Sequence, residues 1–106
     1  MTINEYQKEA LRTAGEANIV NGVLGLCGES GECADMVKKC FFQGHKLDTE
    51  HFAKELGDVA WYLAVSAYAI GYDLETIMQM NVDKLRKRYP DGFDSDLSQH
   101  RKEGDV

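Results

Sequence analysis

A single proline in 106 residues is the feature that most limits what this chain can fold into. Turn-rich β folds place proline at many turns, and their strands alternate apolar with polar residues. Pro90 is the only proline, and no segment of the sequence shows that alternation. The sequence therefore predicts an all-α protein.

Helix boundary signals divide the chain into four predicted helices. The first begins with a T-x-x-E capping box at Thr2 and is expected to end at Gly15. Each of the others follows a residue of N-cap type and ends at glycine or proline, over about 18–42, 48–71 and 73–90. These helices form one predicted domain over 1–93, followed by a polar tail over 94–106.

Charge and hydropathy exclude several classes of partner. The 12 basic and 18 acidic side chains give a net charge of -6, which argues against nucleic-acid binding. The longest apolar run is far short of the roughly 18 residues of a membrane span. The N-terminus lacks the basic and apolar regions of a signal peptide. We therefore expect no membrane partner.

The cysteines indicate the compartment. Cys27, Cys33 and Cys40 are odd in number and form no C-x-x-C pair, which argues against a disulfide framework and a structural zinc site. They are expected to be small buried hydrophobic residues in a reducing cytoplasm.

Two glutamates interrupt the apolar stripe of the second predicted helix. At about 100° per residue, Glu29 and Glu32 lie within roughly 60° of each other. Cys33, Met36 and Cys40 fall within about 40° of Glu29 on the same scale. The two carboxylates therefore share the apolar face of their helix.

The third predicted helix repeats this arrangement. Glu55 and Asp58 are again three residues apart, on the side that carries Phe52, Val59 and other apolar residues. Isolated buried charge is too costly to persist, so this cluster of carboxylates must be protonated, paired with basic groups or neutralised by metal. Oxygen ligands alone suit Mg²⁺, with Mn²⁺ as the alternative.

Glycines recur at every third position of the second helix, at Gly22, Gly25, Gly28 and Gly31. Each costs about 1 kcal/mol relative to alanine in a helix interior. No Gly-Lys-Ser/Thr follows, so a phosphate loop is a poor explanation. Close helix packing is favoured over backbone clearance beside a ligand.

At this point the residues resemble a known family. "GESGE", "KELGDVAWYLA" and "NVDKLRKRYPDGF" are similar to the MazG-like nucleoside triphosphate pyrophosphohydrolases of the all-α NTP pyrophosphatase superfamily. Their motif is E-E-x-x-E followed, after a variable gap, by E-x-x-D. Glu29, Glu32, Glu55 and Asp58 match the last two acids of the first half and both acids of the second. Gly28 stands where the strict motif has its first glutamate.

The resemblance implies an activity and a catalytic set. The activity is Mg²⁺-dependent hydrolysis of an NTP or dNTP to the monophosphate and pyrophosphate, in house-cleaning or nucleotide-pool control. The resemblance assigns Glu29, Glu32, Glu55 and Asp58 as catalytic metal ligands, with one glutamate near the attacking water. It also implies a four-helix MazG-like protomer that assembles into a helical-bundle homodimer or homotetramer.

Substrate contacts are expected from two further segments. Asn81, Lys84 and Arg88 line one face of the fourth helix at i, i+3 and i+7, and they resemble the N-x-x-K-x-x-x-R set that contacts phosphates. Tyr62 and Trp61 follow Asp58 and are candidates for contact with the base. Solvated basic groups and core aromatics are the plain alternatives.

Two other functions remain open from the sequence. The main rival is a non-enzymatic helical interaction module whose acidic cluster pairs with basic groups. A metal-carboxylate protein with oxidative chemistry is weaker, because no glutamate is followed three residues later by histidine. His45, His51 and His100 are expected to have surface roles.

Overall fold

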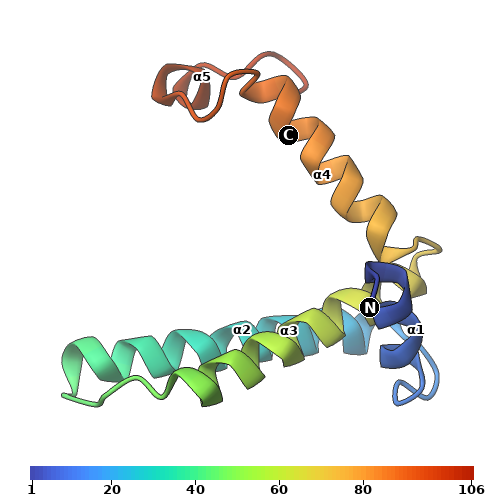
Figure 1. Cartoon of the computed structure of the whole chain (residues 1–106), viewed down its shortest axis with the longest axis vertical. Helices are drawn as coiled ribbons and strands as arrows, with labels where there is room; N and C mark the ends of the chain where they lie inside the picture. Colours follow the sequence, from blue (N-terminus) through green and yellow to red (C-terminus); the bar gives the residue numbers. More distant parts are fainter. The chain divides into compact units, whose positions relative to one another are not determined.

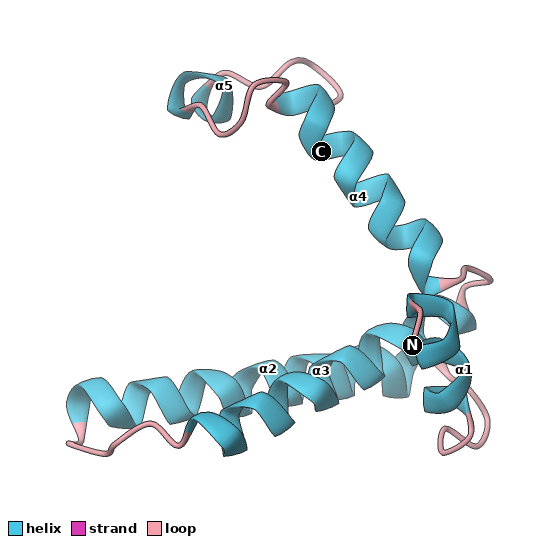
Figure 2. Cartoon of the chain, in the orientation of Figure 1, coloured by secondary structure: helices cyan, strands magenta, loops and turns pink.

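The computed structural model describes all residues from Met1 to Val106. The chain is helical throughout and contains no strand (Figures 1 and 2), which confirms the predicted fold class. Its helices are α1 (Ile3–Leu11), α2 (Ile19–Phe42), α3 (Thr49–Ala69), α4 (Leu74–Arg88) and α5 (Ser95–Gln99). None of them is long and apolar enough to cross a membrane.

The chain divides into two compact units, Met1–Leu74 and Glu75–Val106. In the first unit, the long helices α2 and α3 lie side by side (Figure 1) and share most of the contacts between helices. The turn between them contains Gly44 at φ +70°, a conformation that glycine adopts without strain. This hairpin is the frame of the first unit.

Local capping explains where the helices of this hairpin begin. The Asn18 side chain accepts hydrogen bonds from the backbone N–H groups of Val20 and Asn21. Asp48 accepts one from the N–H of His51 at 3.1 Å. Each cap satisfies donors that the first helical turn leaves unpaired. Both predicted starting points are confirmed.

Gln7 holds the end of α3 and the start of α4 against α1. Its side chain is 5% exposed, and its Nε2 donates to the carbonyl oxygens of Ala64 and Tyr72 at 3.1 and 3.2 Å. Its Oε1 accepts from the N–H of Leu74 at 2.9 Å. A buried amide that uses both ends is stabilising, because no polar group is left without a partner.

Trp61 connects α3 to the end of α1. Its Nε1 donates to the carbonyl oxygen of Ala10 at 3.1 Å and to Oγ1 of Thr13 at 3.0 Å. The helix ends at Leu11, so the prediction that it continues to Gly15 is wrong. Gly15 instead lies in the following loop at φ +62°.

The apolar core of the protomer is small. Its fully buried hydrophobic residues are Ala10, Ala64, Val65, Ala67 and Leu74. Cys27 is exposed, and the other two cysteines are half-buried free thiols, so the expectation of buried cysteines is wrong for the protomer. Many large apolar side chains therefore remain at the surface of the single chain.

The glycines of α2 separate into two pairs. A Cβ on Gly22 would lie 2.4 Å from Oγ of Ser66, and one on Gly25 would lie 2.0 Å from Cε1 of Tyr62. A Cβ on Gly28 or Gly31 would meet nothing within 4 Å. Close packing against α3 thus accounts for the first pair only.

In the second unit, α4 is followed by a turn at Gly92 and by the short helix α5. Asp94 caps α5 by accepting from the N–H groups of Asp96 and Leu97. The polar stretch assigned to a tail therefore includes a fifth helix. The last residues of this stretch lie against α4, where Arg88 forms an ion pair with Asp105.

The glycine pattern predicts opposite effects for two matched substitutions. Gly25→Ala is expected to destabilise the protein by about 1–3 kcal/mol, because the new methyl group overlaps the Tyr62 ring. Gly31→Ala, on the same helix but facing open space, is expected to stabilise it by up to about 1 kcal/mol. Urea unfolding of the two variants measures both values. Equal effects would contradict the packing explanation.

Candidate metal centre

Three carboxylates meet where α2 and α3 pack together. Glu29 comes from α2, whereas Glu55 and Asp58 come from adjacent turns of α3. One carboxylate oxygen from each lies within 4.8 Å of the other two. Glu29 and Glu55 are half-buried and Asp58 is exposed. Residues three apart share a helix face, so both acids of α3 reach the same point opposite α2.

The fourth predicted carboxylate lies apart from this group. Glu32 is exposed in the protomer and does not belong to the cluster formed by Glu29, Glu55 and Asp58. The sequence predicts that four carboxylates point inward from the two helices. Three of them meet in the structure, and Glu32 and Asp58 are exposed. Whether Glu32 binds metal stays a prediction.

Hydrogen bonding, burial and mutual repulsion raise pKa values in and beside the cluster. A hydrogen bond with the Glu55 carboxyl group raises the pKa of Glu29 above its ordinary 4.5, and burial and the charge of Asp58 add to this. Burial, followed by the charges of Glu55 and Glu29, raises the pKa of the Cys33 thiol. Both shifts favour the less charged form, as expected where negative charges crowd together.

The donor set fits a hard divalent cation. All three donors are carboxylate oxygens, which Mg²⁺ and Mn²⁺ prefer over softer ligands. Mg²⁺ holds oxygens at about 2.1 Å, so ligands on opposite sides lie about 4.2 Å apart. The 4.8 Å spread of the three oxygens therefore closes onto one ion with a small side-chain movement.

His51 is a neighbour of the cluster that we did not expect from the sequence. Its Nε2 lies 3.2 Å from Oε1 of Glu55, one helical turn further along α3. Partners of this kind fix the orientation of a carboxylate that binds metal. The i, i+4 spacing of His51 and Glu55 was the available signal, and it indicates more than the surface role predicted for this histidine.

Tyr6 is a second neighbour of the cluster that the sequence did not indicate. Burial raises the pKa of this phenol, and the charge of Asp58 raises it further, so α1 places the ring within electrostatic reach of the cluster. No local pattern in the sequence could have indicated this, because it depends on how α1 packs against α3.

The two aromatic residues predicted to contact the base, Trp61 and Tyr62, both belong to α3. The Tyr62 ring packs over Gly25 and meets the Trp61 ring edge-on, with centroids 4.9 Å apart. Trp61 is further tied to α1 by its hydrogen bonds to Ala10 and Thr13. Packing alone accounts for Trp61, and its contact with a base stays a prediction.

The predicted phosphate contacts belong to α4. Asn81 and Lys84 are exposed on this helix within the second unit. The Arg88 side chain is 9% exposed and paired with Asp105. Their contact with a substrate stays a prediction.

Comparison with known proteins identifies the family of this chain. Residues 21–93 match the family model of the MazG nucleotide pyrophosphohydrolase domain. The Gene 37 protein of Mycobacterium phage L5 is 35% identical to this chain over 101 residues, which cover 83% of the chain and 89% of that protein. No solved structure matches the chain.

The raised pKa of Glu29 predicts the behaviour of an isosteric variant. A folded-state pKa above the ordinary 4.5 means that this group stabilises the metal-free fold fully only below the ordinary value. That contribution is lost as the pH rises through the folded-state pKa. In EDTA at pH 7, Glu29→Gln should therefore unfold at a higher temperature than the wild type, with the difference shrinking toward pH 4.5.

Added Mg²⁺ should reverse that order, because only the wild type retains all three carboxylates. Glu50→Gln is the matched control, since this residue of α3 is exposed and lies outside the cluster. It should follow the wild type with and without Mg²⁺. Equal Mg²⁺ responses in wild type and Glu29→Gln would contradict the assignment.

Proposed function

The chain belongs to the MazG nucleotide pyrophosphohydrolase family, and from this premise we propose that it hydrolyses a nucleoside triphosphate, NTP or dNTP, to the monophosphate and pyrophosphate. The observation that supports the proposal most strongly is the meeting of Glu29, Glu55 and Asp58 across the α2–α3 hairpin. An uncompensated group of three carboxylates costs folding free energy, so its presence indicates a cationic ligand.

The proposed cofactor is Mg²⁺, with Mn²⁺ as the alternative. When bound, the ion neutralises and orients the phosphate oxygens that this acidic protein would otherwise repel. Glu29, Glu55 and Asp58 hold it, and the Nε2 of His51 fixes the carboxylate of Glu55.

Water activation requires a further acceptor. A carboxylate that accepts a proton from the attacking water makes it a better nucleophile. Glu32 is the member of the predicted set whose carboxylate lies outside the group of three, and we assign this step to it. As the water oxygen bonds to phosphorus, its proton would pass to Glu32 and the phosphorus–oxygen bond that joins the α- and β-phosphates would break, which releases the monophosphate and pyrophosphate.

The proposed substrate contacts are those that the sequence indicated. Asn81, Lys84 and Arg88 would contact phosphate oxygens, and Tyr62 and Trp61 are the aromatic candidates for the base. A guanidinium group binds phosphate through two parallel hydrogen bonds, whereas an ammonium group acts as a point charge. Arg88 is therefore the strongest of the proposed phosphate ligands. The proposed role is house-cleaning or nucleotide-pool control.

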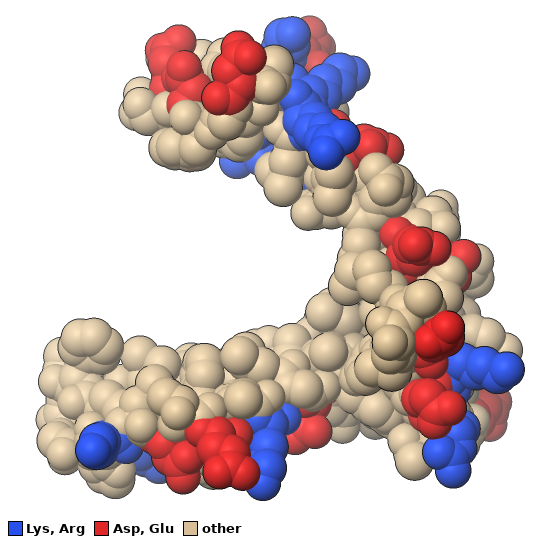
Figure 3. Space-filling view, viewed as in Figure 1, with Lys and Arg blue, Asp and Glu red and all other residues tan.

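We propose in addition that the protein works as a homodimer or homotetramer. Along the α2–α3 pair, Figure 3 shows charged side chains gathered on one edge, with a long uncharged surface beside them. On α2, Leu24 is 68% exposed, and Phe41 and Phe42 at the end of that helix are 79% and 83% exposed. Apolar surface of this extent is typical of an interface.

The activity is tested by following pyrophosphate and orthophosphate separately, with a panel of NTPs and dNTPs and Mg²⁺. Glu55→Gln is expected to lower pyrophosphate release by at least about 100-fold, because it removes a metal ligand from the centre. Glu50→Gln on the same helix should retain full activity.

Other outcomes separate the rival functions. No pyrophosphate from any nucleotide, with thermal stability indifferent to Mg²⁺ and Mn²⁺, would favour a helical interaction module whose acids pair with basic groups of a partner. Iron retained on purification, with a visible absorption band, would favour oxidative chemistry. Release of orthophosphate in place of pyrophosphate would contradict the proposed bond cleavage.

The assembly is tested by light scattering coupled to gel filtration. The wild type should have two or four times the mass of one chain, and Leu24→Asp should lower that mass because it places charge on the exposed apolar surface of α2. A wild-type protein that remains a single chain at micromolar concentration would contradict the proposed assembly.

A further inference from the structure

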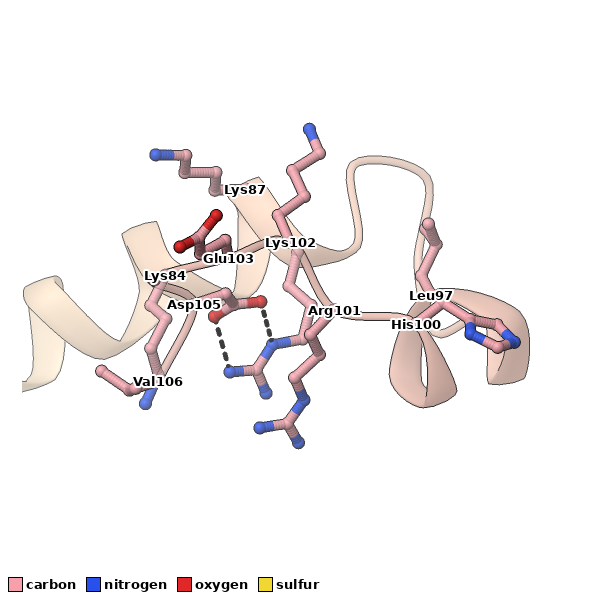
Figure 4. Close-up of a pocket in the computed structure, with 11 residues that line it drawn as sticks. Lys84, Lys87, Leu97, His100, Arg101, Lys102, Glu103, Asp105 and Val106 are labelled. Carbon is pink, nitrogen blue, oxygen red and sulfur yellow. Dashed lines mark hydrogen bonds and ion pairs between the residues drawn. The ribbon is translucent and has the colours of Figure 1, made fainter.

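The second unit contains a basic pocket formed by the end of α4 and the last residues of the chain. Its volume is about 380 Å³, and Figure 4 shows the side chains that surround it. Figure 3 shows Lys and Arg gathered over this part of the chain. The cationic side chains that line the pocket are Lys84, Lys87, Arg88, Arg101 and Lys102.

An anion already lies in this pocket, and it belongs to the chain itself. Nε of Arg88 donates to Oδ2 of Asp105 at 2.9 Å, and a terminal nitrogen of Arg88 donates to Oδ1 at 2.8 Å, as the dashed lines in Figure 4 mark. The two side chains are 9% and 19% exposed. This two-bonded geometry is the one in which a guanidinium group also binds a phosphate.

Further cations surround the same carboxylate. The hydrogen bonds from Arg88 hold the pKa of Asp105 below its ordinary value, and the charges of Arg101 and Lys84 lower it further. The carboxylate in turn raises the pKa of Arg88. The site therefore favours negative charge, because the lining holds five cationic side chains and two carboxylates, Glu103 and Asp105.

Little structure holds Asp105 in place apart from this ion pair. Its segment follows α5 outside any helix, and the Asp105 N–H donates to the carbonyl oxygen of Lys102 at 3.1 Å in a turn with Gly104 at φ +84°. A short exposed segment of this kind opens at low free-energy cost. Displacement of Asp105 therefore leaves the rest of the unit intact.

We propose that the pocket is a phosphate-binding site that the Asp105 carboxylate occupies at rest, and that a phosphate group displaces it. A phosphate group carries more charge and more acceptor oxygens than a carboxylate, so it competes for Arg88, Lys84 and Arg101. The C-terminal segment then acts as an internal competitor that lowers the affinity for phosphate. Phosphate contact by Lys84 and Arg88 is part of the proposed function, on which this inference rests. The new element is that Asp105 occupies the site at rest and is displaced.

The binding test uses inorganic pyrophosphate in EDTA, because the carboxylate centre holds no phosphate without metal. Calorimetry should show that Asp105→Asn binds pyrophosphate about tenfold more tightly than the wild type, which corresponds to about 1.4 kcal/mol. Glu103→Gln is the matched control, since it removes the same charge from the same segment but leaves the Arg88 pair intact. Its affinity should stay within about twofold of the wild type.

A double variant identifies the site. Adding Arg88→Gln to Asp105→Asn should abolish the gain in affinity, because it removes the guanidinium group that holds both anions. Equal affinities in Asp105→Asn and Glu103→Gln would overturn the proposal. A gain that survives the loss of Arg88 would overturn it as well.

Displacement can be followed in the unmodified protein, so the result does not depend on how a variant folds. In ¹⁵N-resolved spectra, pyrophosphate should shift the Arg88 Nε–H signal and move the Asp105 amide toward the position of an unstructured residue. Pyrophosphate that binds while both signals stay in place would overturn the proposal. A nucleoside monophosphate as a second probe identifies which end of a nucleotide the pocket accepts.

The kinetic arm separates this inference from the proposed function. With Mg²⁺ and an active nucleotide, Asp105→Asn should lower KM by about the same tenfold factor with kcat unchanged. If no variant hydrolyses any nucleotide but pyrophosphate still displaces Asp105, the proposed function fails and the phosphate pocket stands. If hydrolysis occurs and Asp105→Asn has the KM of the wild type, the regulatory role fails.

Discussion

Repulsion between carboxylates across the α2–α3 hairpin is the constraint on which the rest of this structure depends. Glu29 faces Glu55 and Asp58 closely enough for its pKa to rise. A fold that keeps these side chains together without a cation loses stability, and a positively charged ligand would recover it. The chain belongs to the MazG nucleotide pyrophosphohydrolase family, and a bound cation would also offset the charge of nucleotide phosphates.

Contacts around the cluster determine how α1, α2 and α3 pack together. Gly25 lets the Tyr62 ring lie directly against the backbone of α2. Gln7 of α1 donates to the carbonyl oxygen of Ala64 in α3. Trp61 of α3 donates to the carbonyl oxygen of Ala10 at the end of α1 and to Oγ1 of Thr13 just beyond it. The same small chain leaves many large apolar residues exposed, and this is the observation behind the proposed assembly.

Local signals in the sequence made the helices of the hairpin predictable. Asn18 and Asp48 cap their helices through contacts two or three residues away, so pattern alone located the hairpin and the meeting of acids from both helices. Long-range contacts decided the rest. The first helix ends at Leu11, where Trp61 bonds to the carbonyl oxygen of Ala10, and not at Gly15. No periodicity indicates that an aspartate in the polar tail pairs with an arginine of α4. The 60° between Glu29 and Glu32 on an ideal helix was also too coarse to show that only Glu29 joins the group with Glu55 and Asp58.

The most direct test of the central claim is to locate manganese in crystals of the protein grown with Mn²⁺. Anomalous diffraction should show an ion between α2 and α3, with carboxylate oxygens of Glu29, Glu55 and Asp58 among its ligands at about 2.2 Å. Manganese bound only elsewhere, or none at millimolar concentration, would contradict the account.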